Sequence, residues 1–283
     1  MRVYLDYNIY NSIQKDNNFN QIRQSGHKFY LSVIHVEEFY KAYQRDKEGH
    51  NRQNLENLKD IMISLSPNGI LNPQQGSRII NKREKFEDCL SRVKKDNTQK
   101  QIANFAKQEL EHQKRESKTN IEKDIKNLNN SNLSPEEIWS AIIVQEKIKA
   151  YQWQTSTDVL KTLKPVYGLR VAVNQSEQHK YPPFALQKNI YKKVESNFQW
   201  IEETIECLDN ILCECCYNRD NNSRKAESGI YDVGHLIYAT YCDLFVTLDK
   251  KLLNKAQAIY YYLGAETKAI SYDDFKKELK TEV

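Results

Sequence analysis

The sequence is poor in the residues that interrupt regular structure, with only 8 Gly and 6 Pro among 283 residues. This scarcity argues against long low-complexity or disordered arms. The chain also lacks a run of about 18 apolar residues, which a membrane-spanning helix needs. Its opening residues 1–6 reach an acid too early for a signal peptide. We therefore expect an ordered, helix-rich protein that does not associate with a membrane.

Cysteine is also scarce, and the six cysteines do not form the regular framework of a small secreted domain. A reducing cytoplasm is the expected compartment. Cys213 and Cys216 have C-x-x-C spacing, but neither a second pair nor a His lies at a usual zinc-ligand distance, which favours buried thiols. The sequence contains no P-loop, dinucleotide-binding glycine motif or Gly-x-Ser-x-Gly elbow.

The formal net charge of +4 is too small to indicate nucleic-acid binding by itself. However, residues 76–126 hold 14 Lys and Arg against 9 Asp and Glu. This segment could contact phosphates, form an interface with a subunit or inhibitor, or simply be a solvated helix surface. The sequence leaves these alternatives open.

The two ends of the chain alternate between predicted strands and helices. Strands are predicted at residues 2–6, 29–32, 244–248 and 268–270. Helices are predicted at residues 8–13, 33–43, 232–241, 250–263 and 272–279. This alternation predicts an α/β fold in which one parallel sheet is built from both termini, residues 1–50 and 225–283.

The middle of the chain, residues 51–224, is predicted to be a mainly helical insertion or cap. Ser134, Pro135 and Glu137 give a strong helix start. A second long helix is predicted from residue 183 or 184 to residue 218, followed by a charged loop over residues 218–228.

Four acids lie where α/β proteins usually have their ligand-binding or active sites. Asp6 ends the first predicted strand and Asp249 follows a later one, so both could face the crevice at the strand carboxyl ends. Glu38 and Asp232 lie on helices beside those strands. Clustered carboxylates repel one another unless a cation joins them, and all-oxygen ligands suit Mg²⁺ or Mn²⁺.

In this pattern the sequence resembles the PIN-domain nuclease family. The family's strand followed by Asp-x-Asn is matched by residues 3–8, and its Ser followed six residues later by Glu is matched by Ser32 and Glu38. Residues 232–240 resemble its acid-led helix, and residues 244–249 match its strand followed by Thr-x-Asp. The resemblance covers about residues 1–45 and 225–283, and the large middle segment departs from the family.

The resemblance implies a PIN-like α/β/α core and a set of metal ligands consisting of Asp6, Glu38, Asp232 and Asp249. It also implies that Asn8 and Thr247 support Asp6 or a metal-bound water. It further implies a metal-dependent endonuclease, most simply an endoribonuclease of toxin or defence-effector type, with RNA as substrate and an antitoxin, activator or complex subunit as partner.

Structural interpretations compete with several of these assignments. Asp6, Asp232 and Asp249 could simply cap helices. Glu37 competes with Glu38, because a helix turns about 100° per residue and only one of the two can face the site.

Two further residues are weaker candidates. Asp243 stands at the far end of its strand from Asp249, which favours a structural role. His235 lies on the same helix face as Asp232 and could contact phosphate or pack in the core.

Two other functions stay open from the sequence. One is a DNA-directed, structure-specific PIN-like nuclease, and the other is a non-catalytic PIN-like module that binds RNA or a partner. The oligomeric state is also open.

Overall fold

The structure is a computed structural model. It describes residues 1–67, 69–73, 78–95, 133–144, 188–214, 217–218 and 223–281. Several sequence predictions lie outside these ranges: the C-x-x-C partner Cys216, the continuation of the helix after residue 144, and most of the basic segment beyond residue 95. In the described part of the chain, no helix combines the length and apolar character needed to cross a membrane.

A six-stranded mixed sheet forms the centre of the molecule, with the strand order β4-β3-β2-β1-β5-β6. The strands are β1 (Arg2–Leu5), β2 (Lys28–Ser32), β3 (Ile70–Pro73), β4 (Ile79–Lys82), β5 (Leu244–Thr247) and β6 (Lys268–Ser271). All neighbours run parallel except β3 and β4. β1 lies between β2 and β5, so strands from the two ends of the chain adjoin, as the sequence predicted.

β3 and β4 were not predicted, because residues 51–224 were expected to be mainly helical. β3 pairs with β2, and β4 returns antiparallel beside it. Each strand has only four residues, too few for an alternating pattern to stand out. The sheet therefore extends into the segment that was expected to be an insertion, and it is mixed rather than purely parallel.

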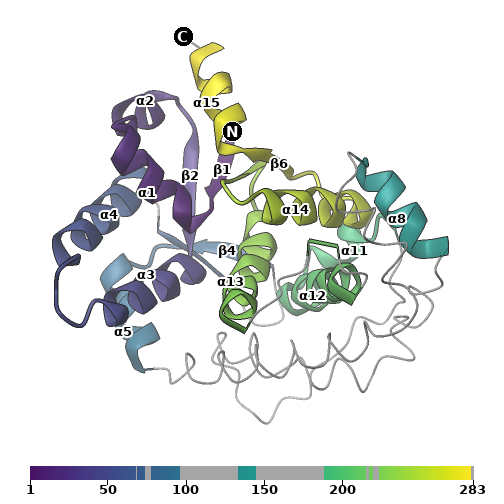
Figure 1. Cartoon of the computed structure of the whole chain (residues 1–283), viewed down its shortest axis with the longest axis horizontal. Helices are drawn as coiled ribbons and strands as arrows, with labels where there is room; N and C mark the ends of the chain where they lie inside the picture. The colour runs from purple at the N-terminus through teal and green to yellow at the C-terminus, as the bar shows by residue number, and fades with distance from the viewer. Residues whose placement is uncertain are drawn as a thin grey trace.

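Helices cover both faces of the sheet (Figure 1). The N-terminal helices lie to the left of β1 and β2 in Figure 1: α1 (Tyr7–Asp16), α2 (Phe19–Gln24), α3 (Val33–Arg45), α4 (Arg52–Leu65) and α5 (Phe86–Lys95). To the right lie α8 (Pro135–Val144), α11 (Tyr191–Val194), α12 (Phe198–Glu214), α13 (Ser223–Ala239) and α14 (Lys250–Leu263). The last helix is α15 (Tyr272–Thr281).

Side chains alternate across the strands and anchor these layers. Tyr4 of β1 contacts His35 of α3 and His235 of α13. Phe29 of β2, whose register partner is the residue before Tyr4, contacts Phe275 of α15. One face of the central strands therefore packs against α3 and α13, and the other packs against α15.

Several predicted helix boundaries are confirmed. The helix α14 has the predicted bounds and ends at Gly264, which adopts a left-handed φ of 73°. At the start of α8, the Glu137 carboxylate accepts hydrogen bonds from the backbone N–H and the hydroxyl of Ser134. These boundaries depend on local capping groups, which a sequence displays directly.

Two boundaries were wrong. The long helix expected to reach residue 218 is split into α11 and α12. The expected loop over residues 218–228 already becomes helical at Ser223, so Asp232 lies inside α13 instead of opening it. Residues 223–228 have no apolar periodicity, and Gly229 costs a helix only about 1 kcal/mol. Neither feature reveals that the helix starts early.

Candidate metal centre

Three parallel strands end at one edge of the sheet and bring the candidate residues together. Asp6 follows β1, Ser32 ends β2 and leads into α3, and Thr247 ends β5. The backbone N–H of Asp6 donates to the carbonyl of Val246 at 2.9 Å, so the β1–β5 pairing extends into the site. This edge is the carboxyl end of the strands, where open parallel sheets bind ligands.

Asp6 is almost fully buried, with 2% of its surface exposed. Thr247 Oγ1 donates to Asp6 Oδ2 at 2.9 Å and accepts from the backbone N–H of Asp249 at 3.0 Å. Burial raises the pKa of Asp6 to about 6 and repulsion from Glu38 adds to the increase, while His235 and the Thr247 hydrogen bond oppose it. Thr247 thus contacts Asp6 as the family resemblance implied.

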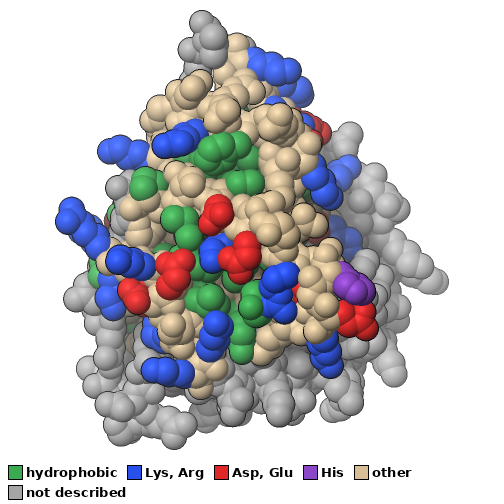
Figure 2. All heavy atoms as spheres, turned by 90° about the vertical axis from the view of Figure 1, so that its left-hand side faces the viewer, with side chains coloured by type: hydrophobic (Ala, Val, Ile, Leu, Met, Phe, Trp, Pro, Cys, Tyr) green, Lys and Arg blue, Asp and Glu red, His purple; other side chains and the backbone are tan. Residues whose placement is uncertain are grey.

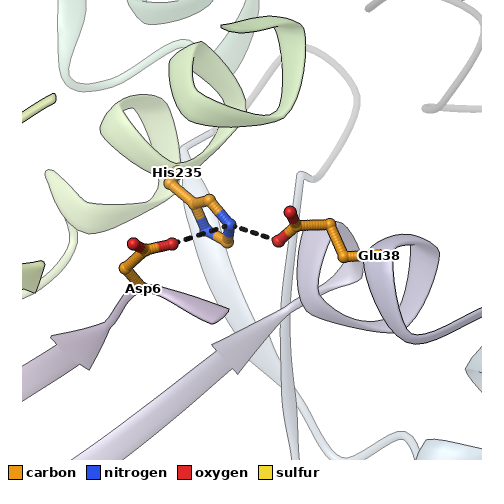
Figure 3. Close-up of side chains that lie close together, drawn as sticks. All are labelled: Asp6, Glu38 and His235. Atoms are coloured by element: carbon orange, nitrogen blue, oxygen red, sulfur yellow. Dashed lines mark hydrogen bonds and ion pairs between the residues drawn. The ribbon is translucent and has the colours of Figure 1, made fainter. Parts of the chain in front are cut away.

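Glu38 and His235 complete a compact group with Asp6 (Figure 3). His235 Nε2 lies 2.7 Å from Glu38 Oε2 and 3.6 Å from Asp6 Oδ1. One potential ligand atom from each of the three residues lies within 4.8 Å of the other two, so this group could hold a metal ion. His235 is fully buried.

The choice between Glu37 and Glu38 follows from the turn of α3. Glu38 approaches His235. Glu37 is buried, and no oxygen of its carboxylate belongs to the group formed by Asp6, Glu38 and His235. Of these two neighbouring acids, only Glu38 belongs to the group around Asp6.

Asp232 lies on α13, one turn before His235. Its pKa is raised well above the usual value, first by burial and then by repulsion from Asp6, Glu38 and Asp249. Among the residues that the structure describes, none forms a hydrogen bond with its carboxylate. The other three acids named from the sequence therefore all add to the raised pKa of Asp232.

Asp249 has two roles in the structure. Its Oδ1 accepts hydrogen bonds from the backbone N–H groups of Lys251 and Leu252 at 2.7 and 3.1 Å, so it caps α14. The capping interpretation is thus correct. Asp249 also lines, with Asp232 and Lys255, a cavity of about 20 Å³, which is large enough for one water molecule or ion.

Lys255 supplies a positive charge beside these acids. Its Nζ lies 2.9 Å from Asp209 Oδ1 and 3.0 Å from Cys213 Sγ. It slightly offsets the rise in the pKa of Asp232. Because Asp209 already pairs with Lys255, the positive charge does not neutralise the acid group.

Two sequence candidates lie apart from this group. Asp243 stands at the amino end of β5, where Arg2 donates to its carboxylate at 2.6 Å and lowers its pKa. Asn8 lies on the exposed side of the first turn of α1, and its side chain forms no hydrogen bond with Asp6 in the described structure. Asp243 is structural, and the structure gives Asn8 no supporting contact.

The residues behind the group were not identified as site residues from the sequence. Tyr4 and His35 are fully buried, and Tyr4 forms a hydrogen bond to His235 Nδ1 at 2.9 Å. In the sequence, Tyr4 is one apolar residue of a predicted strand. Only the hydrogen bonds of its hydroxyl to Ser32 and to His235 of α13 reveal its contact with the site.

The fold and the site together define an α/β protein with a cluster of acids at the carboxyl edge of its sheet. Carboxylate oxygens suit Mg²⁺ and Mn²⁺, whereas an imidazole nitrogen suits zinc and later transition metals. No family model, curated protein or solved structure matches this chain.

The acid cluster predicts a dependence of stability on pH that can be measured without a metal. Because the folded-state pKa of Asp232 is raised, its ionisation destabilises the folded state as pH rises above the ordinary value of 3.8. We expect Asp232→Asn to raise the Tm of the metal-free protein at pH 8. The increase should be about 2–4 °C for each kcal/mol of repulsion that the substitution removes. The difference should shrink toward pH 4.

The matched control is Asp243→Asn, which removes a carboxylate that pairs with Arg2 outside the cluster. It should not raise Tm at pH 8. If Asp232→Asn lowered Tm equally at both pH values, the proposed repulsion among these acids would be wrong.

Proposed function

We propose that this chain is a metal-dependent nuclease that hydrolyses phosphodiesters, most simply an endoribonuclease of toxin or defence-effector type. One observation carries the proposal: Asp6, Glu38 and Asp249, from three other segments of the chain, all add to the raised pKa of the buried Asp232. Such repulsion destabilises the metal-free protein, and a bound cation would relieve it. The resemblance to PIN-domain nucleases supports the same function.

The donor chemistry fits a hard divalent ion. Asp6, Glu38 and Asp232 would hold it, and the free carboxylate oxygen of Asp249 would reach it directly or through a water. When bound, Mg²⁺ or Mn²⁺ would supply a water of lowered pKa and neutralise charge on the leaving oxygen. Thr247 holds Asp6 in place, and the fixed strand ends keep the carboxylates oriented.

A polar groove farther along α1 and α3 offers a path for substrate. It has a volume of about 900 Å³ and lies between α1, α3 and the start of α4. Both α1 and α3 begin at the acid cluster and run away from it. The groove residue Ala42 lies four residues after Glu38, which is about 6 Å along the helix. A strand with its phosphate at Glu38 could therefore continue into this groove.

The charges in the groove suit a phosphate backbone. Lys15 and Lys47 line it and have no acidic partner among the described residues. Of the two acids in the groove, Asp46 lies 3.5 Å from Arg52 and Glu48 lies 3.6 Å from His50. Figure 2 shows this side of the molecule, where Lys and Arg side chains surround acidic ones instead of forming one basic patch. Because the positive charge is dispersed, moderate and salt-sensitive binding is expected.

The acid assignment predicts loss of cleavage with retained folding. We expect Asp6→Asn and Glu38→Gln each to lower Mn²⁺-dependent RNA cleavage by more than about 100-fold, beyond the 10- to 100-fold typical of residues behind a ligand. The measurement is a cleavage assay on single-stranded RNA, single-stranded DNA and branched DNA, with and without Mn²⁺. Asp243→Asn is the control and should cut at the wild-type rate.

The other outcomes distinguish the alternatives. Preferential cutting of branched DNA would replace RNA with DNA as the substrate class. If no substrate is cut and Mn²⁺ does not raise Tm, the chain is instead a non-catalytic binding module. Wild-type cleavage by Asp6→Asn would contradict the site assignment itself.

The groove predicts a separate effect on binding. The double variant Lys15→Glu with Lys47→Glu should weaken RNA binding and raise KM with little change in kcat. If each lysine contacts one phosphate, the slope of log affinity against log salt should fall by about 1.4 for a single strand. Titrations at several salt concentrations measure the slope.

The double variant Lys28→Glu with Lys268→Glu makes the same charge change at the amino ends of β2 and β6, away from the groove. It should leave the slope unchanged. Equal losses in the groove variant and in this control would show that only net charge matters, and would remove the groove from the proposal.

A further inference from the structure

A continuous line of buried hydrogen bonds runs inward from the acid cluster. His235 Nε2 meets Glu38 at 2.7 Å, and its Nδ1 meets the Tyr4 hydroxyl at 2.9 Å. Tyr4 Oη lies 2.6 Å from Ser32 Oγ, which lies 3.3 Å from His35 Nδ1. His35 Nε2 then meets the carbonyl oxygen of Leu5 at 2.7 Å.

The inner end of this line has a fixed direction. The carbonyl oxygen of Leu5 can only accept, so His35 Nε2 carries a proton and donates it. Burial lowers the pKa of His35 well below its usual value, so the ring is neutral and its Nδ1 is an acceptor. The backbone N–H of Ser32 donates to that Nδ1 at 3.0 Å.

The outer end also has a preferred direction. His235 Nε2 faces two carboxylates, Glu38 at 2.7 Å and Asp6 at 3.6 Å. Ionised carboxylates only accept, so Nε2 is the nitrogen that carries a proton. Nδ1 then either accepts from the hydroxyl of Tyr4, with Tyr4 Oη accepting in turn from Ser32, or, in a doubly protonated ring, donates to Tyr4 and turns the hydroxyls inward.

The distances favour this direction over the reverse. If His235 were a metal ligand through Nε2, its Nδ1–H would donate to Tyr4 and every hydroxyl would point inward. That order requires Ser32 to donate to His35 Nδ1 across 3.3 Å, the longest contact of the line, to an atom that already accepts from a backbone N–H. In the opposite order, Ser32 donates to Tyr4, Tyr4 to His235 and His235 to Glu38. This order needs only the contacts of 2.6, 2.9 and 2.7 Å.

We propose that His235 is a positioning residue and not a metal ligand, and that the hydroxyls of Tyr4 and Ser32 fix it in the Nε2–H tautomer. In this state the imidazole donates to Glu38 and holds its carboxylate beside Asp6. The ion then has only oxygen ligands, which suits Mg²⁺ or Mn²⁺ better than zinc. This inference rests on the proposed metal site, but the tautomer itself can be observed in the metal-free protein.

The direct test is nuclear magnetic resonance of the full chain labelled with ¹⁵N at histidine, with the His235 signals assigned through their absence in His235→Gln. We expect the Nε2–H tautomer in the metal-free protein, retained after addition of diamagnetic Mg²⁺. Tyr4→Phe should shift the Nδ1 resonance, because that nitrogen loses its donor. An Nδ1–H tautomer or a doubly protonated ring in either state would overturn the proposal.

Tyr10→Phe is the matched control. Tyr10 is also fully buried and its ring contacts His35, but its hydroxyl faces Ser66 and does not belong to this line of hydrogen bonds. This variant should leave the His235 resonances in place. Equal shifts in the two variants, or no shift in Tyr4→Phe, would contradict the role of the Tyr4 hydroxyl.

Metal titration supplies the functional readout. We expect Tyr4→Phe to weaken Mn²⁺ binding by about 10- to 100-fold, as for other residues behind metal ligands, and Tyr10→Phe to leave it unchanged. Unchanged Mn²⁺ affinity in Tyr4→Phe would remove the positioning role. If wild-type protein bound no Mn²⁺ but kept the Nε2–H tautomer, the proposed nuclease function would fail while the hydrogen-bond direction stood.

Discussion

Repulsion among carboxylates at one edge of the sheet is the constraint on which the rest of this structure depends. Asp6 is buried, with its pKa raised to about 6, and Asp232 is affected by three other acids. A fold stabilised only by packing would not gather these groups. The donors around them, Thr247 and His235, lessen the cost without removing it. A bound cation would relieve the repulsion that remains between these carboxylates. Other proteins also give up stability at a site that is needed for activity.

Local signals in the sequence were sufficient to predict the central strands and the positions of the acids. The apolar run before Asp6 and the run before Asp249 both form strands that end at the same edge. Helix α14 was predictable from end to end because Asp249 caps its start and Gly264 its end. The choice of Glu38 over Glu37 also agrees with the geometry. The spacing from Ser32, where α3 begins, determines which side of the helix a residue faces.

Features that depend on distant partners could not be predicted. The strands β3 and β4 gain their order from pairing with β2 and with each other, and four residues carry no readable pattern. Asp232 was expected to open a helix, yet α13 begins nine residues earlier at Ser223. Tyr4 reads as an ordinary core residue, because its polar contact arises only when β1, β2 and α13 meet. Each missed feature requires the tertiary structure that it helps to form.

The start of α3 illustrates how folding and site geometry share the same atoms. Ser32 and His35 form a capping box, in which the residue three after the cap is usually Glu or Gln. A Glu there could still accept the Ser32 N–H and close the helix. It could not also donate to the carbonyl of Leu5, as His35 Nε2 does at 2.7 Å. His35 therefore joins the helix start to the residue just before Asp6, so any movement of α3 relative to β1 would also move Glu38 relative to Asp6.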